Sequence, residues 1–299
     1  MNKVAAVVVT YNRIELLKHC VEKLLKQTKN CDILLVNNAS TDETELWAES
    51  QVVKQKSVFY RNTGSNIGGA GGFNFGVRWA IEAGYDYVWL MDDDCLPYEN
   101  ALEELLNADL LLKGKYGWLS SAVLWKDGRE CNMNRPKIKK SFYDYLELIQ
   151  YGLVQAEQAT FVSLFVKAAV IRSVGLPIKD FFIWGDDIEY TRRISVRNSI
   201  PCFLVGKSKV CHAMATNNGS SLATDVPERI SRYNYAFRNE NYLYRKEGIC
   251  GLAFYFAKCG WNLIKILRDA PNNKFYRSSV ILKNMISGLF FNPNIEKVD

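Results

Sequence analysis

Three consecutive aspartates, Asp92, Asp93 and Asp94, end an apolar run that begins at Tyr85. The run is rich in β-branched and aromatic residues and has the length of a strand, which predicts a buried β-strand. Neighbouring carboxylates repel one another unless a cation neutralises them. The carboxyl end of a buried strand is also where an open α/β sheet builds its ligand site. Oxygen ligands suit Mg²⁺ or Mn²⁺, so the triplet indicates a metal site. The alternative is a solvated acidic turn.

Runs typical of strands alternate with runs typical of helices along the first part of the chain. Strands are predicted at residues 4–9, 32–36, 58–60, 118–125, 160–166, 201–205 and 209–212. An apolar stripe at helical spacing follows the first strand, and Asn12 with Glu15 is predicted to cap this helix. Strands alternating with capped helices predict an α/β fold with a mostly parallel, doubly wound sheet. From residue 226 onward the pattern is helical, so we expect a catalytic domain over 1–224 and a helical region over 225–299.

Composition narrows the class of protein. The chain is 48% hydrophobic and 23% charged, which is typical of a globular protein. Its eight cysteines include no C-x-x-C pair, which argues against a zinc ribbon or a disulfide framework. The first apolar run is too short for a signal peptide, and no helix long enough to span a bilayer is expected. We therefore expect a cytoplasmic protein.

Most of the net charge of +6 lies in the last quarter of the chain. Residues 225–299 hold 12 Lys and Arg against seven Asp and Glu. A basic end suits anionic lipid or a phosphorylated substrate. No nucleic-acid-binding motif accompanies it, so a nucleic-acid partner is not expected.

The stretch from Gly64 to Gly72 is rich in glycine and leads into a predicted helix. Its spacing fits neither the dinucleotide fingerprint nor the P-loop. Glycines before a helix let backbone N–H groups approach a phosphate. The alternative is a tight turn with close helix packing.

A second acidic motif lies further along the chain, where Trp184 and Gly185 precede Asp186 and Asp187. A carboxylate in a partly apolar cleft has a raised proton affinity and can act as a general base, and Trp184 can stack on a sugar face. The alternative is that one aspartate caps a helix. His212 ends a predicted strand just before residues 213–224, a polar segment expected to be a mobile loop. A histidine at this position is either structural or a metal ligand.

Together these motifs resemble the inverting GT-A glycosyltransferases of family 2, and more narrowly the galactofuranosyl- and rhamnosyltransferase branch. The matching segments occur in the family's order over residues 1 to about 215: 8–13, 36–42, 66–73, 92–94, 184–190 and His212. Many members carry Asp where this chain has Asn37, which is a departure from the pattern.

The resemblance implies a role for each matching residue. Thr10, Asn12, Arg13 and Asn38 would hold the nucleoside, and Asp93 would also contact the donor. Asn66 and Gly69 would line the donor pocket. Asp92, Asp94 and His212 would bind Mn²⁺ or Mg²⁺. Asp187 would be the base, Asp186 would orient the acceptor, and Trp184 would contact it.

The implied reaction moves galactofuranose or rhamnose from a UDP or dTDP sugar to a hydroxyl of a growing lipid-linked glycan. Two alternatives from other classes are a nucleotide-sugar or polyphosphate hydrolase, which needs no acceptor site, and a non-catalytic membrane-associated scaffold.

The C-terminal region carries a further stripe at helical spacing, which predicts reversible docking on an anionic membrane at the inner face of the cell membrane. The residues of the stripe are Leu252, Tyr255, Phe256, Cys259, Leu263, Ile266 and Leu267. The alternative is that the stripe packs on the catalytic domain or pairs two copies of the chain in a homo-oligomer.

Overall fold

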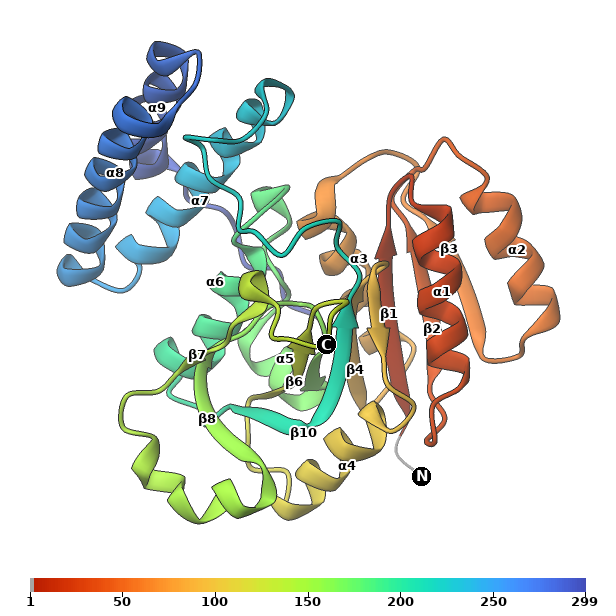
Figure 1. The fold of residues 1–299 in the computed structure, drawn as a ribbon. Coiled ribbons are helices and arrows are strands. Elements are labelled where there is room, and N and C mark those ends of the chain that lie inside the picture. The colour runs from red at the N-terminus through yellow and green to blue at the C-terminus, as the bar shows by residue number, and fades with distance from the viewer. Residues whose placement is uncertain (1–2) are drawn as a thin grey trace.

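The computed structural model describes residues 3–299, so residues 1 and 2 of the predicted catalytic domain lie outside it (Figure 1). Its centre is a ten-stranded sheet with the order β3-β2-β1-β4-β9-β6-β10-β8-β7, and β5 pairs with β10. The strands are β1 Val4–Thr10, β2 Asp32–Asn37, β3 Val58–Asn62, β4 Tyr87–Asp92, β5 Cys95–Pro97, β6 Trp118–Leu124, β7 Lys137–Ile138, β8 Leu153–Gln158, β9 Leu164–Lys167 and β10 Phe203–His212.

The strands of this sheet run predominantly in one direction. β1, β2, β3 and β4 pair in parallel, and β10 pairs in parallel with β6. β9 lies between β4 and β6 and is antiparallel to both, so β4 and β6 also point the same way. The carboxyl ends of β1, β2, β4, β6 and β10 therefore meet at one edge of the sheet, which is the edge where such sheets bind ligands.

Helices cover both faces of the sheet, which confirms the predicted doubly wound α/β class. Alternate side chains of β1 point to opposite faces, so Val4, Ala6 and Val8 join one core and Ala5, Val7 and Val9 join the other. One face is covered by α1 Ile14–Leu25, α2 Thr44–Lys54 and α4 Ala101–Leu111, and the other by α3 Gly68–Glu82, α5 Ala168–Val174 and α6 Asp186–Arg192.

Glycines of α3 bring this helix unusually close to the sheet. A Cβ at Gly72 would lie 2.5 Å from a methyl group of Val9, and one at Gly76 would lie 2.4 Å from a methyl group of Val7. Close packing is therefore part of what the glycine-rich segment does. Gly69, in contrast, has no atom within 4 Å of the place where its Cβ would lie, so the first turn of α3 borders open space.

The middle of the chain differs from the sequence prediction, which did not include β5, β7 or β8. The strand predicted at 160–166 begins only at Leu164, because residues 161–163 form a turn with Ser163 at a positive φ of 64°. The two short strands predicted at 201–205 and 209–212 form a single strand, β10, which has an irregular register between Val205 and Lys209. Short 3₁₀ turns at Asn132–Asn134 and Phe142–Tyr151 connect the strands around it.

The C-terminal region is helical, as predicted. It comprises a 3₁₀ turn at Pro227–Arg232, then α7 Tyr233–Arg245, α8 Ile249–Asp269 and α9 Lys274–Phe290, which pack together at one end of the molecule (Figure 1). The chain then returns to the sheet domain, where Glu296 accepts a hydrogen bond from Asn74 of α3 at 2.9 Å. The division of the chain at residue 224 stays a prediction.

Candidate active site

The predicted site residues come together at the carboxyl edge of the sheet because their strands are neighbours there. Asp92 ends β4 and lies opposite Val9 of β1, while Thr10 lies opposite Asn37 at the end of β2. β5 turns back from the aspartates and pairs with β10, which places His212 opposite Cys95. Residues more than a hundred positions apart in the sequence thus share one edge.

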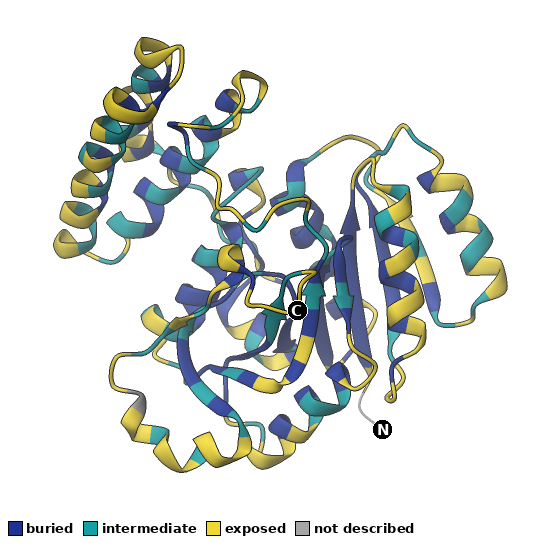
Figure 2. Ribbon diagram, in the orientation of Figure 1, coloured by how far each residue is buried: buried dark blue, intermediate teal, exposed yellow. Residues whose placement is uncertain are grey.

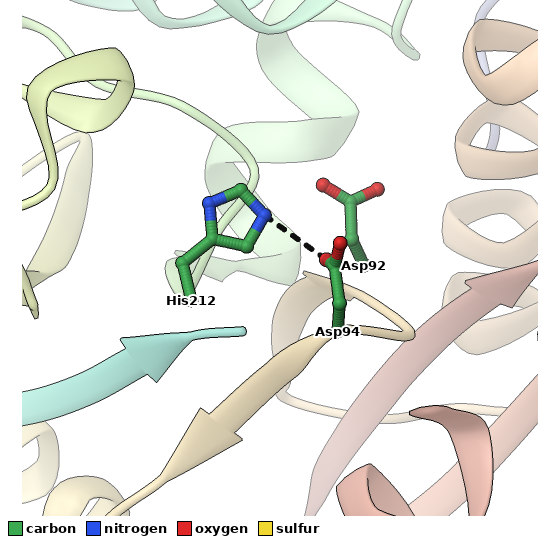
Figure 3. A group of neighbouring side chains, drawn as sticks. All are labelled: Asp92, Asp94 and His212. Atoms are coloured by element: carbon green, nitrogen blue, oxygen red, sulfur yellow. Dashed lines mark hydrogen bonds and ion pairs between the residues drawn. The ribbon is translucent and has the colours of Figure 1, made fainter. Parts of the chain in front are cut away.

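Asp92, Asp94 and His212 form a cluster that can hold a metal ion. One ligand atom of each lies within 4.8 Å of the others, and Figure 3 shows the three side chains facing one another. His212 Nε2 lies 3.0 Å from Asp94 Oδ1. Two carboxylate oxygens and one imidazole nitrogen are a donor set that suits Mn²⁺ or Mg²⁺, so the residues fit the predicted cation.

Electrostatics show how strongly this cluster favours positive charge. Burial, together with the charge of Asp94, raises the pKa of Asp92 to about 7. Burial also acts to raise the pKa of Asp94, but His212 and Arg13 outweigh it and hold that pKa below its usual value. Burial disfavours charge on His212, yet the hydrogen bond to Asp94 and the nearby carboxylates raise its pKa to about 10. Without a metal, the imidazolium supplies the positive charge.

Asp93 points to different partners. Its Oδ2 accepts a hydrogen bond from the Thr10 hydroxyl at 2.7 Å, and Arg13 Nη1 lies 3.3 Å from its Oδ1 and 3.0 Å from Asp94 Oδ2. Burial raises the pKa of Asp93 to about 6 although Arg13 opposes this. Thr10 is buried and Arg13 is half-exposed, so Arg13 is the member of this group that a ligand can reach.

The predicted cap at Asn12 is wrong. Asn12 has a positive φ of 54°, and its side-chain oxygen accepts a hydrogen bond from the Thr41 N–H at 2.7 Å. Helix α1 begins after Arg13, whose own side chain does not cap it, and Asp42 Oδ2 accepts a hydrogen bond from the Ile14 N–H at 3.3 Å. Asn12 therefore joins the loop after β1 to the loop after β2, which is a tertiary role that a local capping pattern does not reveal.

Asn38 connects the end of β2 to the glycine-rich turn. Its Oδ1 accepts a hydrogen bond from the Ile67 N–H at 3.0 Å, and its Nδ2 donates to Asn66 Oδ1 at 3.2 Å. Asn66 Oδ1 also accepts from the Gly68 N–H at 2.9 Å. Asn37 is fully buried and donates to the Tyr60 hydroxyl, so it supports the loop.

The second acidic motif lies on a backbone loop of unusual conformation. Phe182, Trp184 and Gly185 have positive φ values of 62°, 65° and 86°. Gly185 is the N-terminal cap of α6, so the alternative that Asp186 or Asp187 caps this helix is wrong: both lie in its first turn. Non-glycine residues in this region of backbone space are costly and need support from their surroundings.

Asn239 of α7 supplies much of that support. It is fully buried, and its side-chain amide donates to the carbonyl oxygens of Phe181, Ile183 and Trp184 at 2.9, 3.3 and 2.8 Å. On the other side of the loop, the carbonyl oxygen of Phe182 accepts a hydrogen bond from the Ala70 N–H in the first turn of α3. The loop is thus held between the glycine-rich helix and the C-terminal helices.

Aromatic residues of the C-terminal region also contact this loop. Trp184 meets Tyr233 edge to face with ring centroids 5.0 Å apart, and Phe182 stacks on Tyr235 at 4.9 Å. Sequence reasoning missed Asn239, Tyr233 and Tyr235, because they lie about 50 residues further along the chain. The dense aromatic spacing from Tyr233 onward was the available signal.

The two carboxyl groups of the acidic pair differ in proton affinity. Burial raises the pKa of Asp187 to about 6. Burial, then the charges of Asp187 and Asp92, raise the pKa of Asp186 well above its usual value. The charge of Asp92 thus acts on Asp186, so the acidic pair and the candidate metal cluster interact electrostatically. Neighbouring carboxyl groups of different proton affinity can take different roles in acid–base chemistry.

Residues 213–224, the segment predicted to be a mobile loop, start at the metal cluster. The Ala213 N–H donates to the Asp94 carbonyl oxygen at 2.8 Å. Further along, Asn217 exchanges hydrogen bonds with Asn132 at 2.8 and 3.0 Å. The mobility of this segment stays a prediction.

Comparisons with known proteins agree with this geometry. The model of the family "Glycosyl transferase family 2" matches residues 5–110. Galactofuranosyltransferase GlfT1 of Mycolicibacterium smegmatis is 24% identical over 287 residues, covering 89% of this chain and 91% of the relative. The structure of S. aureus TarS 1-349 superimposes with a TM-score of 0.53 at 14% identity, covering 96% of this chain and 72% of TarS. The structure of GalNAc-T7 with UDP, GalNAc and Mn²⁺ superimposes with a TM-score of 0.58 at 12% identity, covering 87% of this chain and 55% of GalNAc-T7. The likenesses to solved structures confirm the predicted fold class.

The contacts of Asn239 lead to a prediction about the loop that carries the acidic pair. Asn239→Ala removes the amide that donates to three carbonyl oxygens, of which that of Phe181 keeps the Ile183 N–H at 2.7 Å. We expect the variant to lower the free energy of unfolding by about 1–3 kcal/mol. We also expect faster amide hydrogen exchange over residues 181–187, measured by mass spectrometry. Asn241→Ala is the matched control, because Asn241 is equally buried on α7 but donates to Met285 of α9. Unchanged amide hydrogen exchange over residues 181–187 in Asn239→Ala would show that Asn239 does not support this loop.

Proposed function

We propose that this chain, a glycosyltransferase with a family 2 domain over residues 5–110, transfers galactofuranose or rhamnose from a UDP or dTDP sugar to a hydroxyl of a lipid-linked glycan. The observation that carries the proposal is the Asp92–Asp94–His212 cluster at the carboxyl edge of the sheet, where the charge of Asp92 also acts on Asp186 of the acidic pair. The name of the relative GlfT1, a galactofuranosyltransferase, supports galactofuranose as the sugar that is transferred. The UDP and Mn²⁺ bound to GalNAc-T7 support a nucleotide-sugar donor and a divalent cation.

The donor would bind between the metal cluster and the first turn of α3. Asp92, Asp94 and His212 would hold a divalent cation, which neutralises negative charge on the diphosphate leaving group when bound. The open space at Gly69 lies at the N-terminus of α3, where backbone N–H groups and the helix dipole favour phosphate. Arg13 adds a half-exposed positive charge.

Several predicted donor contacts are already engaged within the protein. Asn12, Asn38 and Asn66 hold the loops of this edge together, and Thr10 holds Asp93. In the proposed complex they shape the nucleoside pocket by fixing these loops, and the nucleoside contacts the atoms that remain free.

The acceptor would bind on the opposite side, against the half-buried ring of Trp184. Asp187 takes the proton from an acceptor hydroxyl, the oxygen attacks the anomeric carbon, and the bond to the diphosphate breaks with its electron pair leaving on the diphosphate. Asp186, whose pKa burial raises well above its usual value, orients the acceptor by hydrogen bonding. Attack from the face opposite the leaving group inverts the anomeric centre, and residues 213–224 close over the donor to exclude water.

The proposal predicts the effect of removing the base. Asp187→Asn is nearly isosteric, so we expect an unchanged fold and donor affinity, with sugar transfer lower by roughly 10²–10⁴-fold. Because Asp187 works as an anion and its pKa is about 6, kcat/KM of the parent enzyme should fall as the pH decreases through 6 and level off above it. Transfer is followed by release of nucleoside diphosphate from a panel of nucleotide sugars.

Asp186→Asn is the comparison variant for this experiment. It keeps the proposed base and replaces one carboxyl oxygen of Asp186 with an amide nitrogen, so its loss of transfer should be smaller and its pH profile should keep the step near 6. If Asp187→Asn transfers sugar at the parent rate and Asp186→Asn loses transfer, then Asp186 is the base and the assignment of Asp187 is wrong.

We further propose that α8 and α9 bring the enzyme to an anionic membrane surface. Three residues of the predicted stripe on α8, Tyr255, Cys259 and Ile266, are buried among the C-terminal helices, so this side of α8 is not free to dock. Figure 2 shows exposed residues along the outer side of α8 and α9. The exposed apolar residues of the two helices include Phe256 and Leu267 from the predicted stripe, and we assign this set to docking. It consists of Ile249, Phe254, Phe256, Trp261, Ile264, Leu267, Phe275, Leu282, Ile286, Leu289 and Phe290.

The charge around this exposed apolar set favours an anionic surface. Between residues 249 and 290 the sequence holds six Lys and Arg but one acidic residue, Asp269, which pairs with Arg268. Arg277 is fully buried and Lys258 pairs with Glu240, so Lys265, Lys274 and Lys283 carry the remaining positive charge of this stretch. Phe275 and Phe290 are 90% and 78% exposed, which is unusual for phenylalanine in water. Among residues 3–299 no helix is long and apolar enough to cross a bilayer, so the proposed docking is interfacial.

This proposal predicts salt-sensitive binding to anionic vesicles, because each cation near an anionic surface contributes about 1 kcal/mol. We expect Phe275→Ser combined with Ile286→Ser to abolish co-sedimentation with anionic vesicles at low salt. The control is Leu46→Ser combined with Val53→Ser, which removes equally exposed apolar residues from α2. If the intact protein ignores anionic vesicles and sediments as an oligomer that the α9 variant dissociates, the exposed set pairs two copies of the chain.

A further inference from the structure

His212 has two ring nitrogens, and they face different partners. Nε2 lies 3.0 Å from Asp94 Oδ1, on the side of the metal cluster. Nδ1 lies 2.7 Å from the side-chain oxygen of Asn134, which comes from the 3₁₀ turn Asn132–Asn134. Both residues are buried. An amide oxygen only accepts hydrogen bonds, so the proton of this contact belongs to Nδ1.

Asn134 is itself fixed so that its oxygen points at the ring. Its Nδ2 donates to the Thr160 hydroxyl at 2.8 Å, and its backbone N–H donates to the Cys131 carbonyl oxygen at 3.0 Å. The Cys131 thiol donates to the same Asn134 oxygen at 3.0 Å. With its amide nitrogen committed to Thr160, the side chain presents its oxygen, and not its nitrogen, to His212.

This arrangement decides which nitrogen can bind a metal. An imidazole ligates through the lone pair of a deprotonated nitrogen, and the hydrogen bond made by the other nitrogen selects that tautomer and orients the ring. With the proton held on Nδ1 by Asn134, the lone pair falls on Nε2, which is the atom that faces Asp94.

We propose that Asn134 is a positioning residue for the divalent cation: it holds His212 in the Nδ1–H tautomer with Nε2 directed at the site formed with Asp92 and Asp94. This inference rests on the metal site of the proposed function and adds a residue that the sequence motifs did not include. The outer partner is a neutral amide, so it orients the ligand without adding charge to an already acidic cluster.

The test is Mn²⁺ affinity, measured by electron paramagnetic resonance of free Mn²⁺, which needs neither donor nor acceptor. We expect Asn134→Leu to raise the Kd for Mn²⁺ by roughly 10- to 100-fold, the usual effect of losing such a partner. Asn134→Asp retains an accepting oxygen and should keep the Kd at or below that of the parent. Asn132→Ala, in the same turn but bonded to Asn217, should leave the Kd unchanged.

A double-mutant cycle separates this role from general support of the fold. In a His212→Ala background, Asn134→Leu should have no further effect on Mn²⁺ affinity, because the imidazole ligand that Asn134 orients is absent. Parent-like affinity in Asn134→Leu, or equal losses in Asn134→Leu and Asn134→Asp, would overturn the inference and leave the metal site standing. A parent protein that binds no Mn²⁺ would overturn the metal site and this inference together.

Discussion

The repulsion between buried carboxylates at the end of β4 is the constraint on which the rest of the site depends. Asp93, Asp94 and Asp186 are buried and Asp92 is partly buried, and carboxylates in such surroundings ionise together only if positive charge is close. Arg13 and His212 supply part of it. The pKa values of Asp92 and Asp93 stay raised, at about 7 and 6, because the nearby positive charges offset only part of the effect of burial and of the neighbouring carboxylates. The divalent cation of the proposed function would offset the remaining repulsion between these carboxylates.

The C-terminal helices support the loop that carries the acidic pair. The loop that carries Trp184, Asp186 and Asp187 has several positive φ values and does not hold its own shape. It lies between the first turn of α3 and the amide of Asn239 on α7. The same helix α3 borders the proposed donor phosphate. The helical region therefore shapes the loop that carries the acidic pair directly, which is the acceptor side in the proposed function, while its outer helices carry the exposed apolar residues proposed to meet a membrane.

The sequence allowed prediction of what local patterns encode. Alternating strands and helices, and polar residues placed after each strand, were enough to predict the α/β sheet and to gather Thr10, Asn38, Asp92 and His212 at one edge. It did not reveal Asn239 or Asn134, because their partners are more than 50 residues away and a buried asparagine has no sequence signature. The helical spacing of apolar residues correctly predicted the helix α8. Apolar residues occur on more than one side of this helix, so the sequence did not show which side is buried by packing. At Asn12 a tertiary bond to Thr41 replaced the expected cap.

The most direct test of the central claim is the affinity for nucleoside diphosphate with and without divalent cation, measured by calorimetry with UDP and dTDP. The account predicts that Mn²⁺ strengthens binding in the parent protein, that excess chelator removes this gain, and that Asp94→Ala abolishes it without unfolding the chain. Equal nucleotide affinity in Mn²⁺ and in chelator, unchanged by Asp94→Ala, would contradict the claim that these carboxylates and His212 form a metal-assisted donor site.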